Sequence, residues 1–178
     1  MRIAKLTGKA KRITYAAVKN LAKERLITIQ EKANLKLCKL NLQNPQIIAF
    51  VESLRWSEFT RRKPEVGLLV SDIISKSELP YFSLAIFGSY AKGVATKKSD
   101  LDMLLMIPDK MFEGTIEAAI ESAKALSNIP VHDVVVTYAE FASMLGENKI
   151  TVAKEALETR LVAYGAEAFY TLVRHHYD

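Results

Sequence analysis

The first 43 residues combine two patterns of apolar spacing. Around Gly8, apolar and small residues recur at the i, i+3, i+4, i+7 positions of a helix, first at Ile3 and Leu6, then at Thr14, Ala17, Val18 and Leu21. Gly8 favours a helix end between the two sets, because glycine adopts the left-handed conformation without penalty. Residues 27–40 alternate between apolar and polar, as the strands of a β-hairpin do. The pattern predicts helix, turn, helix and hairpin.

Residues 44–78 predict two further helices. Asn44 provides an N-cap and Pro45 suits the first helical position. We expect this helix to end at Trp56 and to bury Ile47, Phe50, Val51 and Leu54. A second helix after Pro64 is expected to bury Val66, Leu69, Val70 and Ile73. We interpret residues 44–78 as linker and core helices without chemistry of their own.

Residues 79–178 show short apolar runs that alternate with helical stretches. The runs, which read as strands, are 81–87, 101–107, 131–137 and 161–164. The helical stretches between them are 111–126, 149–158 and 166–175. This alternation predicts an α/β domain, a sheet layered with helices, that is separate from residues 1–43.

Charge is unevenly distributed along the chain of 178 residues. Residues 1–43 contain 11 Lys and Arg but only Glu24 and Glu31 as acids, a net charge of +9, whereas the remainder carries −4. A basic segment of this kind favours a polyanionic partner such as nucleic acid, or is simply a solvated lysine-rich face. The single cysteine, Cys38, has no internal disulfide partner, and no apolar run approaches the roughly 20 residues of a membrane span. We expect a cytoplasmic protein.

The helix, turn and helix of residues 3–26 resemble the winged helix-turn-helix family, with residues 27–40 as the wing. The family's usual first helix has no counterpart before Ile3. The resemblance implies that the second helix binds DNA through its outer face, with Lys11, Arg12, Tyr15 and Lys19 as the candidate contacts. The alternative is that residues 1–43 form a dimerisation or protein-docking module.

Two polar motifs flank the first two strands of the α/β domain. Gly88 and Ser89 follow the first strand, where backbone amides and the Ser89 hydroxyl could hold phosphate oxygens. Asp100 and Asp102 stand two residues apart at the start of the second strand, so both carboxylates project from one face. Paired carboxylates repel each other unless a cation neutralises them, and Mg²⁺ suits two carboxylates with nucleotide phosphates.

The string Gly88-Ser89-Tyr90-Ala91-Lys92-Gly93, followed by Ser99-Asp100-Leu101-Asp102, resembles the DNA polymerase β-type nucleotidyltransferase superfamily, and most of all its minimal members from archaea and bacteria. Lys92 replaces an arginine that is commoner there. The resemblance implies a small mixed sheet with flanking helices, ATP as substrate, and two Mg²⁺ ions held by Asp100, Asp102 and a third carboxylate, for which Asp133 is the candidate. His132 should point to the opposite face from Asp133, as a packed or edge histidine.

These features support an enzyme that transfers a nucleoside monophosphate, AMP from ATP by preference, to an acceptor hydroxyl. Asp100, Asp102 and Asp133 would be catalytic, and Gly88, Ser89 and Lys92 would bind the nucleotide. The resemblance offers two acceptors, a HEPN-type toxin-like protein, as in toxin–antitoxin pairs, or a small molecule, with a homo-oligomer mate completing the pocket. A DNA-binding regulator with a nucleotide-sensing body is the second hypothesis, and an interaction scaffold the third.

Overall fold

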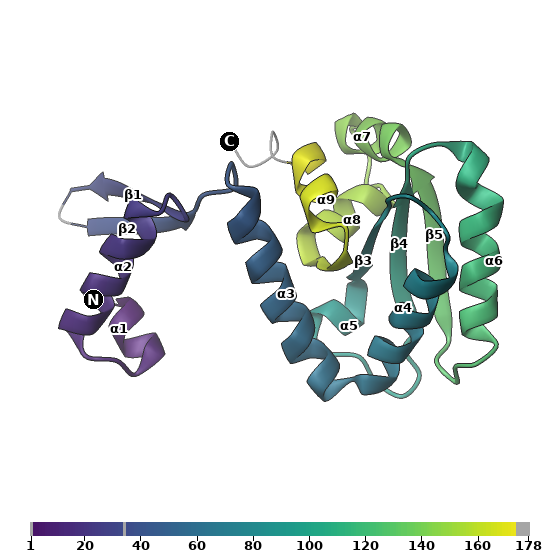
Figure 1. Cartoon of the computed structure of the whole chain (residues 1–178), viewed down its shortest axis with the longest axis horizontal. Coiled ribbons are helices and arrows are strands. Elements are labelled where there is room, and N and C mark those ends of the chain that lie inside the picture. Colours follow the sequence, from purple (N-terminus) through teal and green to yellow (C-terminus); the bar gives the residue numbers. More distant parts are fainter. Residues whose placement is uncertain (1, 34, 174–178) are drawn as a thin grey trace. The chain divides into compact units, whose positions relative to one another are not determined.

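The computed structural model describes residues 2–33 and 35–173, which fall into two units. The first unit ends at Ile48 and the second begins at Ala49 (Figure 1). Within the described residues, no helix combines the length and the apolar character that a membrane span requires.

The first unit contains the predicted helix, turn, helix and hairpin. Its elements are α1 (Arg2–Thr7), α2 (Lys11–Lys23), β1 (Ile27–Lys32) and β2 (Leu35–Leu40). Gly8 ends α1 with a φ of 64°, as predicted, and the two strands pair antiparallel. Helix α2 buries Thr14 and Val18, but the expected burial of Ala17 and Leu21 is wrong, because both lie exposed in so small a core. The winged-helix assignment stays a prediction.

Helix α3 (Pro45–Arg62) begins where the sequence predicts and ends six residues beyond its predicted end. The Asn44 side chain accepts a hydrogen bond from the amide of Gln46 at 3.0 Å, which gives one amide of the first turn its partner. The predicted end at Trp56 is wrong, because Pro64 sets the boundary. Phe50 and Leu54, expected in the core, are 59% and 55% exposed.

Glu52, which the periodicity leaves off the buried face of α3, has a side chain that is only 4% exposed. Its carboxylate accepts hydrogen bonds from the amide of Val162 at 3.1 Å and from the hydroxyl of Tyr170 at 2.8 Å. The guanidinium of Arg55 lies 2.6 Å away and neutralises the charge. A buried carboxylate with three partners fixes α3 against the rest of the second unit.

The second unit is built on a four-stranded mixed sheet in the order β5-β4-β3-β6. The strands are β3 (Ser83–Phe87), β4 (Leu101–Ile107), β5 (Val131–Thr137) and β6 (Leu161–Tyr164). Strand β3 pairs antiparallel with β4 and β6, whereas β4 and β5 are parallel. The predicted strands are present, the first shortened by two residues, and the predicted class of a mixed sheet flanked by helices is confirmed.

Helices cover both faces of this sheet (Figure 1). Helix α4 (Pro64–Lys76), which buries all four predicted residues, packs with α6 (Glu113–Lys124) over the face that carries Leu101, Met103 and Leu105. The other face meets α7 (Tyr138–Gly146), α8 (Val152–Thr159) and α9 (Ala166–Val173). The predicted end of the last helix, His175, lies outside the described residues.

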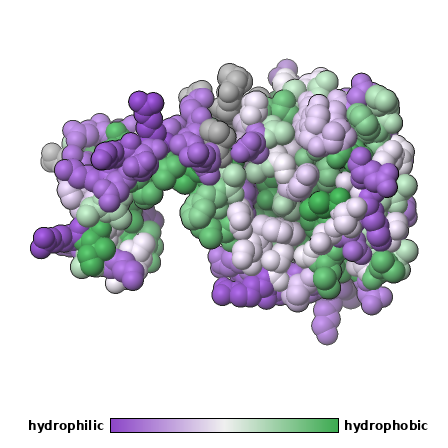
Figure 2. Space-filling view, in the orientation of Figure 1, coloured by the Kyte–Doolittle hydropathy of each residue, from purple (hydrophilic) through white to green (hydrophobic). Residues whose placement is uncertain are grey.

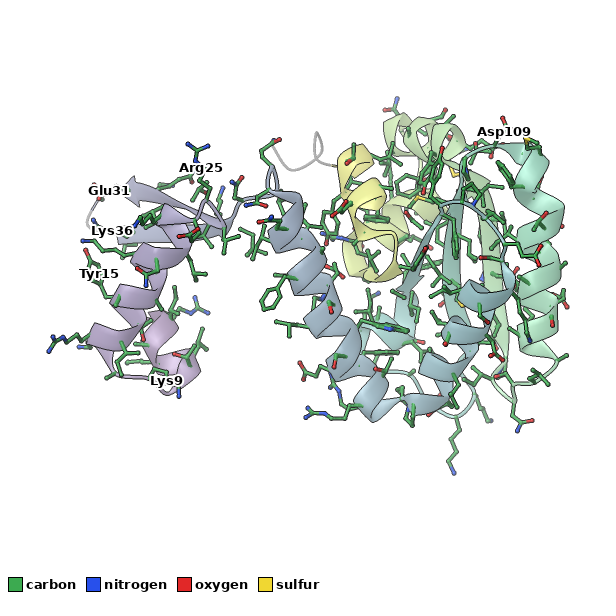
Figure 3. All side chains as sticks on the ribbon, in the orientation of Figure 1. Lys9, Tyr15, Arg25, Glu31, Lys36 and Asp109 are labelled. Atoms are coloured by element: carbon green, nitrogen blue, oxygen red, sulfur yellow. The ribbon has the colours of Figure 1, made fainter. Side chains whose placement is uncertain are left out.

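Helix α7 is absent from the predicted elements. Its start carries a capping box, in which the Thr137 hydroxyl accepts from the amide of Glu140 at 3.1 Å and the Glu140 carboxylate accepts from the amide of Thr137 at 2.8 Å. The Thr-x-x-Glu spacing is readable in the sequence. A short 3-10 helix, Lys110–Phe112, likewise precedes α6, and the Asp109 side chain caps it (Figure 3).

Candidate active site

The turn from β3 into α5 (Gly88–Lys92) requires a glycine for two reasons. Gly88 has a φ of 65°, in the left-handed region. A Cβ built on it would also overlap Oδ2 of Asp102 and lie 3.1 Å from Cγ of the same side chain. The carboxylate of Asp102 therefore packs directly on the Gly88 backbone, which brings the glycine-serine turn and the second aspartate together as the sequence predicts.

His132 is the side chain that meets Asp102 from the neighbouring strand. The two residues are register partners in the parallel pair of β4 and β5, so their side chains leave the same face of the sheet. Nδ1 of His132 lies 3.2 Å from Oδ1 of Asp102. The histidine points away from the face of Asp133, as expected, and lies on the edge strand β5, where it contacts Asp102.

Asp133 does not join Asp100 and Asp102. Its register partner is Met103, whose side chain belongs to the core under α4 and α6. Because side chains alternate along a strand, Asp133 lies on the opposite face from Asp102. Its Oδ1 is 2.5 Å from Nζ of Lys124 in α6. The expected third ligand is therefore corrected: in this structure Asp133 is the partner of a lysine.

Lys124 is stabilised in its charged form by this contact. Burial alone would lower the pKa of Lys124, but hydrogen bonds and charges from Asp133 and Glu121 outweigh the burial and raise that pKa. An aspartate among valines is costly unless it is paired, and the lysine provides the pairing.

Asp100 precedes β4 and is exposed. Burial raises the pKa of the Tyr90 phenol in α5 most, and the negative charges of Glu65 and Asp100 raise it further. Lys92, at the end of α5, is also exposed, and Gly93 closes the helix with a φ of 75°.

Thr159, at the end of α8, is a site residue that the sequence does not reveal. Its Oγ1 accepts a hydrogen bond from the amide of Gly88 at 3.1 Å and donates to the carbonyl of Glu155 at 3.3 Å. The Gly88 amide, expected to bind phosphate, is already occupied by this threonine. Phosphate recognition in this turn would therefore fall to Ser89.

The donor set suits one Mg²⁺ better than two. Asp100 and Asp102 supply hard oxygen ligands next to a turn that could hold phosphates, a combination typical of Mg²⁺ sites. Across residues 2–33 and 35–173, however, no group of three His, Cys, Asp or Glu side chains is arranged to hold a metal ion. Within the described residues the structure does not supply a third carboxylate beside Asp100 and Asp102, and Mg²⁺ binding by these two aspartates stays a prediction.

The candidate DNA contacts lie in the first unit. Lys11, Arg12, Tyr15 and Lys19 are exposed on α2, and Nζ of Lys19 lies 5.6 Å from the centre of the Tyr15 ring. On the hairpin, Lys36 is neutralised by Glu31 at 2.8 Å (Figure 3). Figure 2 shows hydrophilic residues gathered over this hairpin. DNA binding by this unit stays a prediction.

Comparison with known proteins identifies the family of the second unit. Residues 70–158, half of the chain, match the model of the nucleotidyltransferase domain. The chain therefore belongs to the nucleotidyltransferase domain family. The matched segment contains both polar motifs, from Gly88 to Asp102. Neither a curated protein nor a solved structure matches the chain.

Proposed function

We propose that the protein is a Mg²⁺-dependent nucleotidyltransferase that transfers AMP from ATP to an acceptor hydroxyl. In the reaction, the acceptor hydroxyl loses its proton to solvent and its oxygen forms a bond to the α-phosphorus. The bond from that phosphorus to the bridging oxygen breaks, and pyrophosphate leaves with the electron pair. The observation that carries the proposal is the packing of Asp102 on Gly88, because it joins the carboxylate and the phosphate-binding turn within the family's own domain.

Each site residue has a role that follows from its position. Asp100 and Asp102 would hold the Mg²⁺, which when bound neutralises charge on the triphosphate and polarises the reacting phosphate. The Ser89 hydroxyl would donate to a phosphate oxygen, while Thr159 holds the Gly88 amide and so fixes the turn. His132 would orient the Asp102 carboxylate through the contact at 3.2 Å.

Replacing both aspartates tests the proposal. Asp100→Asn with Asp102→Asn removes the charge that would hold the cation, so calorimetric binding of MgATP should fall at least tenfold while the fold survives. Asp72→Asn, in an exposed aspartate of α4 beside Lys76, is the matched control and should bind as wild type. Wild-type MgATP affinity in the double variant would contradict the assignment of these carboxylates.

Transfer itself is tested with α-labelled ATP, Mg²⁺ and candidate acceptors. Two kinds of acceptor are tested: a protein, for which a HEPN-type toxin-like partner is the first to try, and a small molecule, whose pocket a second copy of the chain would complete. Label retained on an acceptor by wild type, and lost in the double variant, supports the enzyme.

The placement of Asp133 favours a second candidate function. Without a third carboxylate, a nucleotide could bind at Asp100 and Asp102 without reacting, and the basic first unit would make the protein a nucleotide-sensing DNA-binding regulator. Intact MgATP binding with no transfer to any acceptor, and a change in DNA affinity on adding MgATP, would favour the regulator over the enzyme.

A further inference from the structure

A pocket lies beside the candidate active site, within the second unit. It has a volume of about 260 Å³ and is bounded by the junction of α3 and α4 on one side and by the end of α5 on the other. Figure 1 shows α5 between these two helices. The lining residues are Phe59, Arg62, Lys63, Tyr90, Ala91, Lys92, Gly93 and Ala95.

The pocket is strongly cationic. Arg62, Lys63 and Lys92 line it, and none of its lining residues is acidic. Among the described residues, no carboxylate is within ion-pair distance of Lys63 or Lys92. Arg62 lies 3.5 Å from Glu58, but both side chains are more than 60% exposed, so this pair is weak.

The floor of the pocket is aromatic and well packed. Phe59 is 9% exposed, and Nζ of Lys63 lies 5.6 Å from the centre of the Tyr90 ring. The ring attracts that ammonium without neutralising its charge. Three like charges around a small concavity repel one another, and a multivalent anion relieves this repulsion most effectively. The volume and the fork of Arg62 suit a phosphate group.

Tyr90 and Lys92 connect this pocket to the aspartates. Both belong to α5, directly after Gly88 and Ser89. The charge of Asp100 also contributes to the raised pKa of Tyr90. The proposed function places the donor triphosphate at Ser89, Asp100 and Asp102, and it leaves Lys92, which the sequence assigns to the nucleotide, for this pocket. A phosphate bound at Arg62 and Lys63 would therefore belong to a different molecule in the same reaction.

We propose that the pocket formed by Arg62, Lys63, Tyr90 and Lys92 binds a phosphate group of the acceptor, so that the acceptor is a phosphate ester, such as a nucleotide. This assignment rests on the proposed transferase function. It narrows the acceptor to molecules that carry their own phosphate at a short distance from the reacting hydroxyl.

Phosphate binding is measured by titrating the ¹⁵N-labelled protein with inorganic phosphate, and separately with AMP, in the absence of Mg²⁺. Saturable shifts are expected at the amides of residues 91–95. Arg62→Ala with Lys63→Ala should weaken binding of both probes at least tenfold. Arg61→Ala with Lys76→Ala removes the same charge from α3 and α4 outside the pocket, and should stay within twofold of wild type.

Tighter binding of AMP than of inorganic phosphate would show that the pocket recognises a nucleotide ester. Equal affinities would show that the pocket recognises the phosphate group alone. The proposal is overturned if neither probe gives saturable shifts, or if the two double variants lose affinity equally.

A second titration separates this proposal from the transferase function. Arg62→Ala with Lys63→Ala should bind MgATP within twofold of wild type, and an equal loss of MgATP would assign the pocket to the donor instead. Asp100→Asn with Asp102→Asn should retain phosphate shifts at residues 91–95. Retained phosphate binding by a wild-type protein that never transfers label would refute the enzyme while leaving the pocket a phosphate site.

Discussion

Gly88→Ala should destabilise the protein more than the same substitution at Gly93, although both glycines have left-handed φ angles, 65° and 75°. A Cβ at Gly93 meets nothing within 4 Å, whereas a Cβ at Gly88 meets the carboxylate of Asp102. The two variants share the cost of the backbone conformation and the gain from a less flexible unfolded chain. Their difference therefore isolates the contact with Asp102.

The magnitudes follow from these two contributions. An alanine held in the left-handed region costs about 1–2 kcal/mol, so Gly93→Ala should lower the free energy of unfolding by about that amount. The Asp102 side chain is partly exposed and can turn away from the new Cβ, and an off-rotamer side chain adds about 1 kcal/mol, so Gly88→Ala should lower the free energy of unfolding by about 2–3 kcal/mol.

Urea unfolding of a double-mutant cycle measures the contact directly. Asp102→Ala removes the carboxylate that the new Cβ would strike, so it should recover about 1 kcal/mol when combined with Gly88→Ala. The corresponding cycle of Asp102→Ala with Gly93→Ala should be additive within about 0.5 kcal/mol. If the Gly88 cycle is additive as well, the packing of Asp102 on the turn is refuted, and with it the observation that carries the proposed function.

Three other substitutions test separate parts of the molecule. Asp133→Asn should lower the free energy of unfolding by about 1 kcal/mol, because a charge-assisted contact is lost, yet calorimetry should show unchanged MgATP binding. Burial and the charge of Glu52 raise the pKa of Tyr170 from 10.0 to about 12. As the pH rises, the unfolded state therefore loses the phenol proton before the folded state does, so the free energy of unfolding should fall between those pH values. In urea unfolding, Tyr170→Phe should lack this fall in stability. Arg12→Ala or Lys19→Ala should each reduce the slope of log affinity for duplex DNA against log salt by about one, in gel-shift titrations, and no binding at low salt would make the first unit a docking module.

The sequence predicts the sheet well because its strands carry strong local signals. The bounds of β4, β5 and β6 match the apolar runs. Asp100 and Pro108 delimit β4, Pro130 precedes β5 and Gly165 follows β6. Burial on α3 is predicted poorly, because apolar spacing assigns Phe50 and Leu54 to the core and gives no weight to Glu52. A buried carboxylate is stable only through partners such as Val162, more than 100 residues away, and periodicity contains no information on such contacts.

The site is predictable where it depends on neighbours in sequence and unpredictable where it depends on strand register. The spacing from Gly88 to Asp102 predicts their proximity, and the structure brings the two together. Which residue of β5 faces Asp102 is decided by a register of one residue, and a shift of one exchanges His132 for Asp133. Thr159 reaches the turn from α8, and no local pattern indicates such a contact.

The bond from the Val162 amide to Glu52 also affects how the sheet can associate with other chains. Strand β6 is one edge of the sheet, and an outward amide there would ordinarily be a template for an added strand. The carboxylate of α3 occupies that donor, so β6 is closed to strand addition. The edge left for a partner strand is β5, which carries His132, so any chain that extended the sheet would be added next to the histidine that contacts Asp102.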